Sequence, residues 1–295
     1  MENKFNKKKV WILNHHAQTP STGSGTRHYD FAQELRHRGY DVTVFASSHM
    51  HYTTKNLLSD GEEYKITDED GLRWVWINTR SYTSNGIQRI LGMYEYYRKV
   101  LKIRKGLEQP DYIIGSAVHL LACVAAYKIA KENKIKCICE IRDLWPETLI
   151  QMGKMKRNSL LARAMNMLED FVYKKSDKII ITAPGMREYI ASRGISEKKI
   201  VYINNGLHTA SFDSRLVENY EDDKKGKLDK QYFNVVYTGA HGLANDLETA
   251  LKAAKNIQDR AYENIIISFF GDGPLKKDLI KKAGEMGLKN VVFRE

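Results

Sequence analysis

Residues Lys136–Glu147, with the sequence KCICEIRDLWPE, show most clearly how this chain folds. A short apolar run at 136–141 is followed at once by charged residues and a proline, which predicts a buried strand that ends in a polar loop. Similar apolar runs recur along the chain, and longer stretches with helical periodicity separate them. This alternation is typical of βαβ units and predicts an α/β fold, with a parallel sheet covered by helices on both faces.

The first two thirds of the chain contain enough of these runs for one complete doubly wound domain. The expected strands are 9–14, 41–46, 73–78, 111–115, 136–141, 178–182 and 199–203, and the expected helices are 26–38, 85–105, 117–131, 159–174 and 185–192. A polar, highly charged stretch around 214–231 favours a solvated linker. A βαβαβ unit follows, with strands at 233–238, 264–270 and 290–293 and helices at 246–256 and 275–286. We therefore expect an N-terminal domain at 1–206, a linker at 207–231 and an incomplete C-terminal domain at 232–295.

Composition and charge narrow the class of protein. The 295 residues are 42% hydrophobic and 28% charged, which is ordinary globular composition and excludes a disordered or fibrous chain. Lys and Arg number 47 against 36 Asp and Glu, and the net charge of +11 favours anionic partners such as nucleotide phosphates, nucleic acid or an acidic membrane surface. The sequence has no basic–aromatic platform or zinc pattern, so nucleic acid is the weakest of these three.

The cysteines and the longest apolar segments favour a cytoplasmic protein. Cys123, Cys137 and Cys139 form no CxxC pair and lie in apolar surroundings, so we interpret them as reduced core residues. The apolar stretch 10–13 is too short for the core of a signal peptide. The charge-free run 112–127 falls short of a membrane span.

The loop after the first expected strand is a candidate anion site. It brings Gly23, Gly25, Thr26 and Arg27 to the start of a helix, where glycines let the backbone approach a phosphate and the helix terminus offers free N–H groups. A tight turn would explain the same residues. A dinucleotide site is disfavoured, because His28 stands where the third glycine is expected and no acidic residue follows the second strand.

Other polar residues follow strands at the edge where open α/β sheets bind ligands. Arg142 and Asp143 are placed to hold a phosphate and a hydroxyl, and the alternative is an Arg–Asp pair that only fixes the loop. His119 is either a ligand donor or a core histidine. In the C-terminal unit, two glycine-rich turns either bind a nucleotide diphosphate or simply connect strand to helix; they contain Gly239, His241, Gly242 and Asn245, and Gly271, Asp272 and Gly273.

Five segments together resemble a known enzyme family. They are Gly23–Tyr29, Arg142–Glu147, Val201–Gly206, Tyr237–Gly239 and Gly271–Pro274. The set is similar to the retaining glycosyltransferases of family 4, with the two-Rossmann-domain GT-B architecture, and to the branch that builds bacterial surface polysaccharides such as O-antigen or capsule. The resemblance extends over residues 9 to 293.

The resemblance implies a hexosyltransferase-type enzyme that moves a sugar from a nucleotide sugar, such as a UDP-sugar, to a lipid-linked or surface-polysaccharide acceptor without a bound metal or other cofactor. Asp143, Arg142 and His119 would be catalytic, and His15 and His16 would contact the acceptor. The donor and its phosphates would be held by Gly23, Gly25, Thr26, Arg27, Gly239, His241, Gly242, Asn245, Gly271, Asp272 and Gly273.

The chain departs from the family pattern in two places. Many relatives carry an Arg and a Lys where this chain has Ala240, His241 and Asn245, and the family's C-terminal pair of glutamates would lie beyond Glu295. We therefore expect a C-terminally truncated transferase, which is either a piece of a longer enzyme or a disrupted product with little or no activity. The alternative is a non-catalytic glycan- or nucleotide-binding module derived from such an enzyme.

The expected helix Asn85 to Lys105 has an apolar stripe and several basic residues, a pattern suited to an anionic membrane surface. A core helix with one solvated face predicts the same spacing. The first interpretation places the protein at the inner face of the cell membrane as a peripheral protein.

Overall fold

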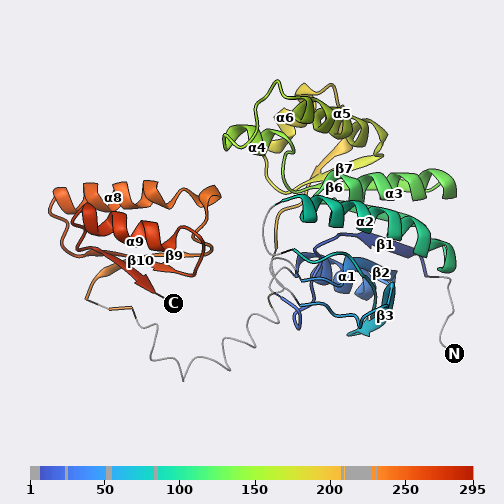
Figure 1. Cartoon of the computed structure of the whole chain (residues 1–295), viewed down its shortest axis with the longest axis horizontal. Helices are drawn as coiled ribbons and strands as arrows, with labels where there is room; N and C mark the ends of the chain where they lie inside the picture. The colour runs from blue at the N-terminus through green and yellow to red at the C-terminus, as the bar shows by residue number, and fades with distance from the viewer. Residues whose placement is uncertain are drawn as a thin grey trace. The chain divides into compact units, whose positions relative to one another are not determined.

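The computed structural model describes residues 7–23, 26–50, 55–82, 86–206, 209, 228–229 and 231–294. The chain separates into two compact units, Met1–His208 and Thr209–Glu295 (Figure 1). Most of the expected linker, including 210–227, lies outside the described residues. Each unit is therefore described by itself.

The first unit is built on one sheet, whose described strands have the order β3-β4-β2-β1-β5-β6-β7-β8. All neighbouring strands are parallel except β3 and β4, which are antiparallel. The strands are β1 (Lys9–Leu13), β2 (Asp41–Ser47), β3 (Tyr64–Glu69), β4 (Leu72–Ile77), β5 (Tyr112–Ala117), β6 (Lys136–Ile141), β7 (Lys178–Ile181) and β8 (Ile200–Tyr202). The helices are α1 (Arg27–His37), α2 (Ile87–Ile103), α3 (Leu120–Asn133), α4 (Glu147–Gln151), α5 (Leu160–Lys175) and α6 (Met186–Ser192).

Two apolar clusters bury the two faces of this sheet. Side chains of α2, α3, α5 and α6 pack on one face, and α1 packs on the other. The strands are apolar on both sides, as parallel strands covered by helices require. The three cysteines are buried in the first cluster and form no disulfide, as expected for core residues.

Helix α3 lies unusually close to β5 at Gly115. A Cβ atom at this position would be only 2.8 Å from the Cβ of Ala126 and from the Cα of Cys123. The Sγ of Cys123 also donates to the carbonyl of Gly115 at 3.2 Å. Glycine is therefore required here so that the backbones can approach.

The second unit contains a parallel sheet of described strands in the order β11-β10-β9. Strands β9 (Phe233–Thr238), β10 (Ile265–Phe270) and β11 (Val291–Arg294) alternate with α8 (Leu247–Asp259) and α9 (Lys276–Glu285). Leu251 and Phe269 are fully buried in a small core between helices and sheet.

The expected strands and helices are all present, with ends that shift by three residues or fewer. Among the strands and α-helices that the structure describes, two were not expected from the sequence. Strand β3 is an edge strand with mostly exposed residues, so it lacks the apolar run of a buried strand. Helix α4 has only five residues, too few to show a period. In the described part of the chain, no helix is both long and apolar enough to span a bilayer.

The close approach at Gly115 predicts a stability effect. Gly115→Val should lower the free energy of unfolding by about 1–3 kcal/mol, because the added methyl groups overpack the contact with α3. The four tryptophans, Trp11, Trp74, Trp76 and Trp145, all lie in the first unit, so urea unfolding followed by tryptophan fluorescence reports on that unit. Gly106→Ala is the control, since no atom lies within 4 Å of its added Cβ. Equal midpoints for the two variants would contradict this account of Gly115.

Candidate active site

The polar residues singled out in the first unit lie at one edge of its sheet. Strands β1, β5 and β6 are neighbours and parallel, so their carboxyl ends meet. Asn14–His16 follow β1, His119 follows β5, and Arg142–Asp143 follow β6. The three loops therefore form one site edge, as is usual for open α/β sheets.

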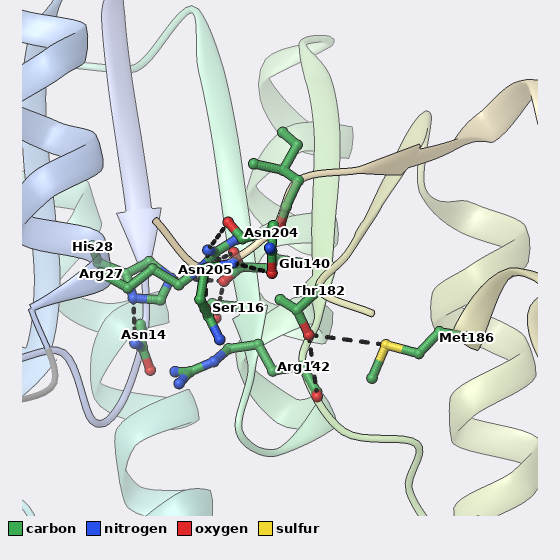
Figure 2. A network of polar contacts seen from close by, with 11 residues as sticks. Asn14, Arg27, His28, Ser116, Glu140, Arg142, Thr182, Met186, Asn204 and Asn205 are labelled. Carbon is green, nitrogen blue, oxygen red and sulfur yellow. Dashed lines mark hydrogen bonds and ion pairs between the residues drawn. The ribbon is translucent and has the colours of Figure 1, made fainter. Parts of the chain in front are cut away.

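A buried carboxylate, Glu140, connects these loops (Figure 2). It is 1% exposed. Its Oε1 accepts from Nε of Arg27 at 2.9 Å, and its Oε2 lies 2.7 Å from Nε2 of His28 and 2.5 Å from the hydroxyl of Ser116. Nδ1 of His28 lies 2.9 Å from the side-chain amide of Asn14. One carboxylate thus joins β6 to the N-terminus of α1, to β5 and, through His28, to the end of β1.

The surroundings of Glu140 keep it ionised. Burial alone would raise its pKa, but the hydrogen bond and charge of His28, the Ser116 hydroxyl and the charge of Arg27 outweigh burial and lower the pKa to about 2. The carboxylate is therefore a fixed negative charge at neutral pH. Removal of one partner would leave a buried charge without compensation and would lower the stability of the fold.

Arg27 is held by the protein rather than directed at solvent. Besides Glu140, its Nη1 donates to the carbonyl of Asn204 at 2.6 Å and to Oδ1 of Asn205 at 3.0 Å, and its Nη2 donates to the carbonyl of Ile203 at 2.9 Å. Its side chain is 8% exposed. These bonds fasten the segment 203–205, by which the chain leaves the first unit, to the start of α1.

The glycine loop before α1 is partly closed on itself. The N–H of Gly23 donates to the carbonyl of Thr19 at 3.1 Å, and the side chain of Gln18 fills the space beside Gly23. The hydroxyl of Thr26 donates to Asp30 at 3.0 Å. Gly25, the second glycine of the expected anion site, lies outside the described residues.

Two histidines from neighbouring strands meet at the same edge. Nδ1 of His15 lies 2.8 Å from Nε2 of His119, and the ring of His15 stacks on Tyr96 with centroids 4.7 Å apart. His16 stacks on His15 in turn, with centroids 4.5 Å apart. The predicted acceptor residues and the predicted catalytic histidine are thus one aromatic cluster.

His119 is neutral at physiological pH. Burial, together with the positive charge of Arg89, lowers its pKa to about 3. Its Nδ1 is buried and finds no hydrogen-bond partner among the described residues. One nitrogen of this neutral imidazole is engaged by His15, and the other is a donor or an acceptor according to its tautomer.

Asp143 stands at the rim of this edge under opposing influences. Its side chain keeps contact with solvent, yet desolvation by the surrounding protein raises its pKa, and the charges of Arg142 and Arg89 oppose that rise. Arg89 acts on both His119 and Asp143, so α2 contributes to the site. From the sequence this helix is recognisable only as amphipathic, because helical periodicity does not show that Arg89 faces a neighbouring loop.

In the second unit the two glycine-rich turns pack directly on one another at the carboxyl ends of β9 and β10. A Cβ at Gly271 would lie 2.1 Å from the carbonyl oxygen of Gly239, and a Cβ at Gly273 would lie 2.6 Å from that of His241. Gly271 also has a positive φ of 124°. Only glycine fits these positions, so the turns form one compact backbone surface.

The polar side chains of these turns mostly bond within them. Asn245 donates to the carbonyl of Ala240 at 2.6 Å, and Asp272 accepts from the N–H of Gly273 at 2.7 Å. The ring of His241 is fully buried beside Phe269, and neither of its nitrogens has a hydrogen-bond partner among the described residues.

A cation that the sequence analysis missed lies beside these turns. Nζ of Lys276 donates to the carbonyls of Gly271 at 2.8 Å and of Arg294 at 2.9 Å, at the first turn of α9. Burial, together with the charge of Lys276, lowers the pKa of His241, although Asp272 opposes the shift. The sequence signal for Lys276 was its position two residues after the Gly-Asp-Gly-Pro turn.

Comparison with known proteins identifies the fold. The probable glycosyltransferase WbjE of Pseudomonas aeruginosa is 20% identical over 224 residues, which are 74% of this chain and 53% of that protein. The chain therefore spans about half the length of this curated relative. Among solved structures, sucrose-phosphate synthase of Thermosynechococcus elongatus aligns with a TM-score of 0.66 and 15% identity, over 97% of this chain and 70% of that one.

HepE of Anabaena, solved in complex with UDP-glucose, aligns with a TM-score of 0.55 and 13% identity, over 97% of this chain and 68% of that one. These likenesses confirm the expected α/β fold of GT-B type. Residues 22–206 match the family model of the glycosyl transferase 4-like domain, which includes every element of the site edge except β1 and its loop. Since the match covers more than half of its residues, the chain belongs to the glycosyl transferase 4-like family.

Proposed function

We propose that this protein transfers a hexose from a UDP-sugar to a hydroxyl group of a lipid-linked or surface-polysaccharide acceptor, with retention of configuration and without a bound metal. The family match and the two solved relatives support glycosyl transfer in general, and HepE was solved with UDP-glucose. The observation that carries the proposal is the site edge itself. It brings together a neutral histidine after β5, Arg142 and a carboxylate of raised pKa after β6, and the charge of Arg89 from α2.

Each of these side chains suits one part of the reaction. The free nitrogen of His119 would hydrogen-bond a hydroxyl of the donor sugar, and Asp143 would hold the acceptor hydroxyl. Arg142 and Arg89 would attract a phosphate group. In the second unit, the tightly packed glycine turns and Lys276 would bind the nucleotide diphosphate.

The proposed reaction is a front-face displacement. The acceptor oxygen forms a bond to the anomeric carbon while the bond from that carbon to the diphosphate oxygen breaks. The proton of the acceptor hydroxyl passes to the departing diphosphate, and the positive side chains stabilise the charge of that diphosphate.

The same proposal includes a cytoplasmic location at the inner face of the membrane and a role in O-antigen or capsule synthesis.

Removal of the Asp143 charge should test this function. With a panel of UDP-sugars, Asp143→Asn should reduce kcat/KM for UDP release by about 10²-fold or more, because the acceptor hydroxyl loses its carboxylate partner. Asp60→Asn, at an exposed loop position, should leave the rate unchanged. If the wild-type chain binds a glycan or UDP but releases no UDP from any donor, the protein is a binding module instead.

The opposing influences on Asp143 predict a particular pH dependence. If the carboxylate is the active form, kcat/KM should fall as pH falls through its raised pKa, above the ordinary value near 4. Arg142→Gln and Arg89→Gln should each move this acid limb to higher pH, because the charges that hold the pKa down are lost. His119 should add no limb above about pH 5, since it is already neutral there. An acid limb that stays in place in both arginine variants would refute the assignment.

The Glu140 network should control both stability and the shape of the site. At pH 7, Glu140→Gln should lower the free energy of unfolding of the first unit by about 3–5 kcal/mol, because Arg27 and His28 lose a buried ionised partner. A depressed carboxyl pKa stabilises the fold above the unfolded value near 4.3 and ceases to do so as pH falls toward 2. The difference between wild type and variant should therefore shrink between pH 4 and pH 2.

One further variant separates charge from geometry. Arg27→Lys keeps the positive charge but cannot bridge Glu140 and the carbonyls of Ile203 and Asn204 together, so it should also destabilise the unit. Glu188→Gln, at an exposed position on α6, is the control and should have no effect. Tryptophan fluorescence during urea unfolding measures all three, and an unchanged midpoint in Glu140→Gln would show that the network contributes little.

A further inference from the structure

Large apolar side chains are exposed on two of the helices that cover the first face of the sheet. On α2 they are Ile87 (64% exposed), Ile90 (57%) and Tyr94 (49%). On α5 they are Leu160 (83%), Leu161 (58%), Met167 (68%) and Phe171 (36%). A soluble surface exposes such residues singly, so a grouped set marks an interaction surface.

The spacing shows that these residues form stripes that face away from the core. Leu160, Met167 and Phe171 stand at i, i+7 and i+11 of α5, with Ala164 between them, whereas Val172 and Tyr173 on the other side of the helix are buried. On α2, Ile87, Ile90 and Tyr94 follow the same helical period.

Helix α3 connects the two stripes. Tyr94 stacks on Tyr97 of α2, and Nζ of Lys128 of α3 lies 5.2 Å from the centre of the Tyr97 ring. On the other side of α3, Tyr127 contacts Phe171 of α5 edge to face, with centroids 5.3 Å apart. The exposed faces of α2, α3 and α5 are therefore one continuous surface, which we call the three-helix face (Figure 1).

The charge of this face is strongly positive. The acidic residues of the three helices are already engaged: Glu95 pairs with Arg80, Glu132 with Arg104 and Asp170 with Arg193, and Glu169 is buried. By contrast, six basic residues of these helices and their C-terminal ends form no ion pair with any described residue. They are Arg98, Lys105, Lys131, Arg163, Lys174 and Lys175. The expected partner is therefore anionic as well as apolar.

The topology places the apolar part of the face beside the site edge. Helices that connect parallel strands run opposite to them, so α2, α3 and α5 all begin at the edge where β5 and β6 end. Ile87 and Leu160 lie in the first turns of α2 and α5, whereas Lys105 and Lys175 lie at the opposite ends.

We propose that the three-helix face docks on a lipid bilayer that contains anionic headgroups. The exposed isoleucine, leucine and aromatic side chains enter the boundary between headgroups and acyl chains, and the lysines and arginines contact the lipid phosphates. A second copy of this chain is a poorer occupant, because a symmetric contact would press six uncompensated cations against six others. The surface adds α3 and α5 to the membrane contact expected for α2. It rests on the proposed location at the inner face of the membrane, but its test does not need transferase activity.

Vesicle sedimentation of the purified full-length chain tests this surface. The wild-type chain should sediment with vesicles of phosphatidylcholine and phosphatidylglycerol, and at least tenfold less with phosphatidylcholine alone. The triple variant Leu160→Asn, Leu161→Asn, Met167→Asn should lose about tenfold or more in partition coefficient. Arg163→Gln combined with Lys174→Gln and Lys175→Gln should lose a similar factor only with the anionic vesicles.

Matched controls come from exposed isoleucines elsewhere on the chain. Ile66→Asn on β3 (44% exposed) and Ile280→Asn on α9 (46% exposed) should sediment as wild type does. All substituted side chains are exposed, and tryptophan fluorescence during unfolding checks that each variant is folded. Equal sedimentation of the triple variant and wild type would overturn the proposal, as would wild-type protein that stays in the supernatant.

Light scattering tests the alternative that a second copy of this chain, and not a bilayer, covers the three-helix face. If wild type self-associates with concentration and the triple variant does not, while neither binds vesicles, the face is an interface between copies and the bilayer proposal is wrong. UDP release from a donor in the absence of vesicles tests the proposed transferase activity separately, so failure of one proposal leaves the other measurable.

Discussion

The ionised carboxylate of Glu140, buried at the end of β6, is the interaction on which the site edge depends. Burying a charge is unfavourable unless hydrogen bonds and an opposite charge compensate for it, and here the partners come from β5, α1 and, through His28, the end of β1. The need to compensate this one charge therefore fixes the geometry of the edge. Arg27, which compensates it, also donates hydrogen bonds to residues 203–205, where the chain leaves the first unit.

Differences in burial and in nearby charge then give His119 and Asp143 different protonation behaviour. The ring of His119 is enclosed next to a cation, so it stays neutral, whereas Asp143 at the rim is held between desolvation and two arginines. The site edge therefore combines three features. They are a neutral hydrogen-bonding ring, a carboxylate whose pKa is set by opposing effects, and the positive charge of two arginines. Glycosyl transfer requires this combination, because a hydroxyl must be oriented and a leaving phosphate stabilised at the same place.

The sequence predicted the architecture well and the role of individual residues less well. Strands such as β6 are continuous apolar runs between polar loops, and this local pattern is enough to find them. The roles of Arg27 and Arg89 depend on contacts between segments far apart in the chain; Arg27 meets Asn204 across 177 positions. Local sequence showed Arg27 as a cation beside two glycines, and it could not show that segment 203–205 already occupies its guanidinium. The edge strand β3 was missed because its side chains are mostly exposed.

The parallel topology has a second consequence besides collecting the loops of the site. Every connecting helix on a given face begins at the same edge of the sheet, so apolar residues in the first turns of α2 and α5 lie beside the loops that carry His119 and Asp143. A bilayer bound at those turns would lie next to the site edge, and an acceptor anchored in that bilayer would reach the site without leaving it. One strand order thus accounts for both the position of the site edge and the position of the proposed membrane surface beside it.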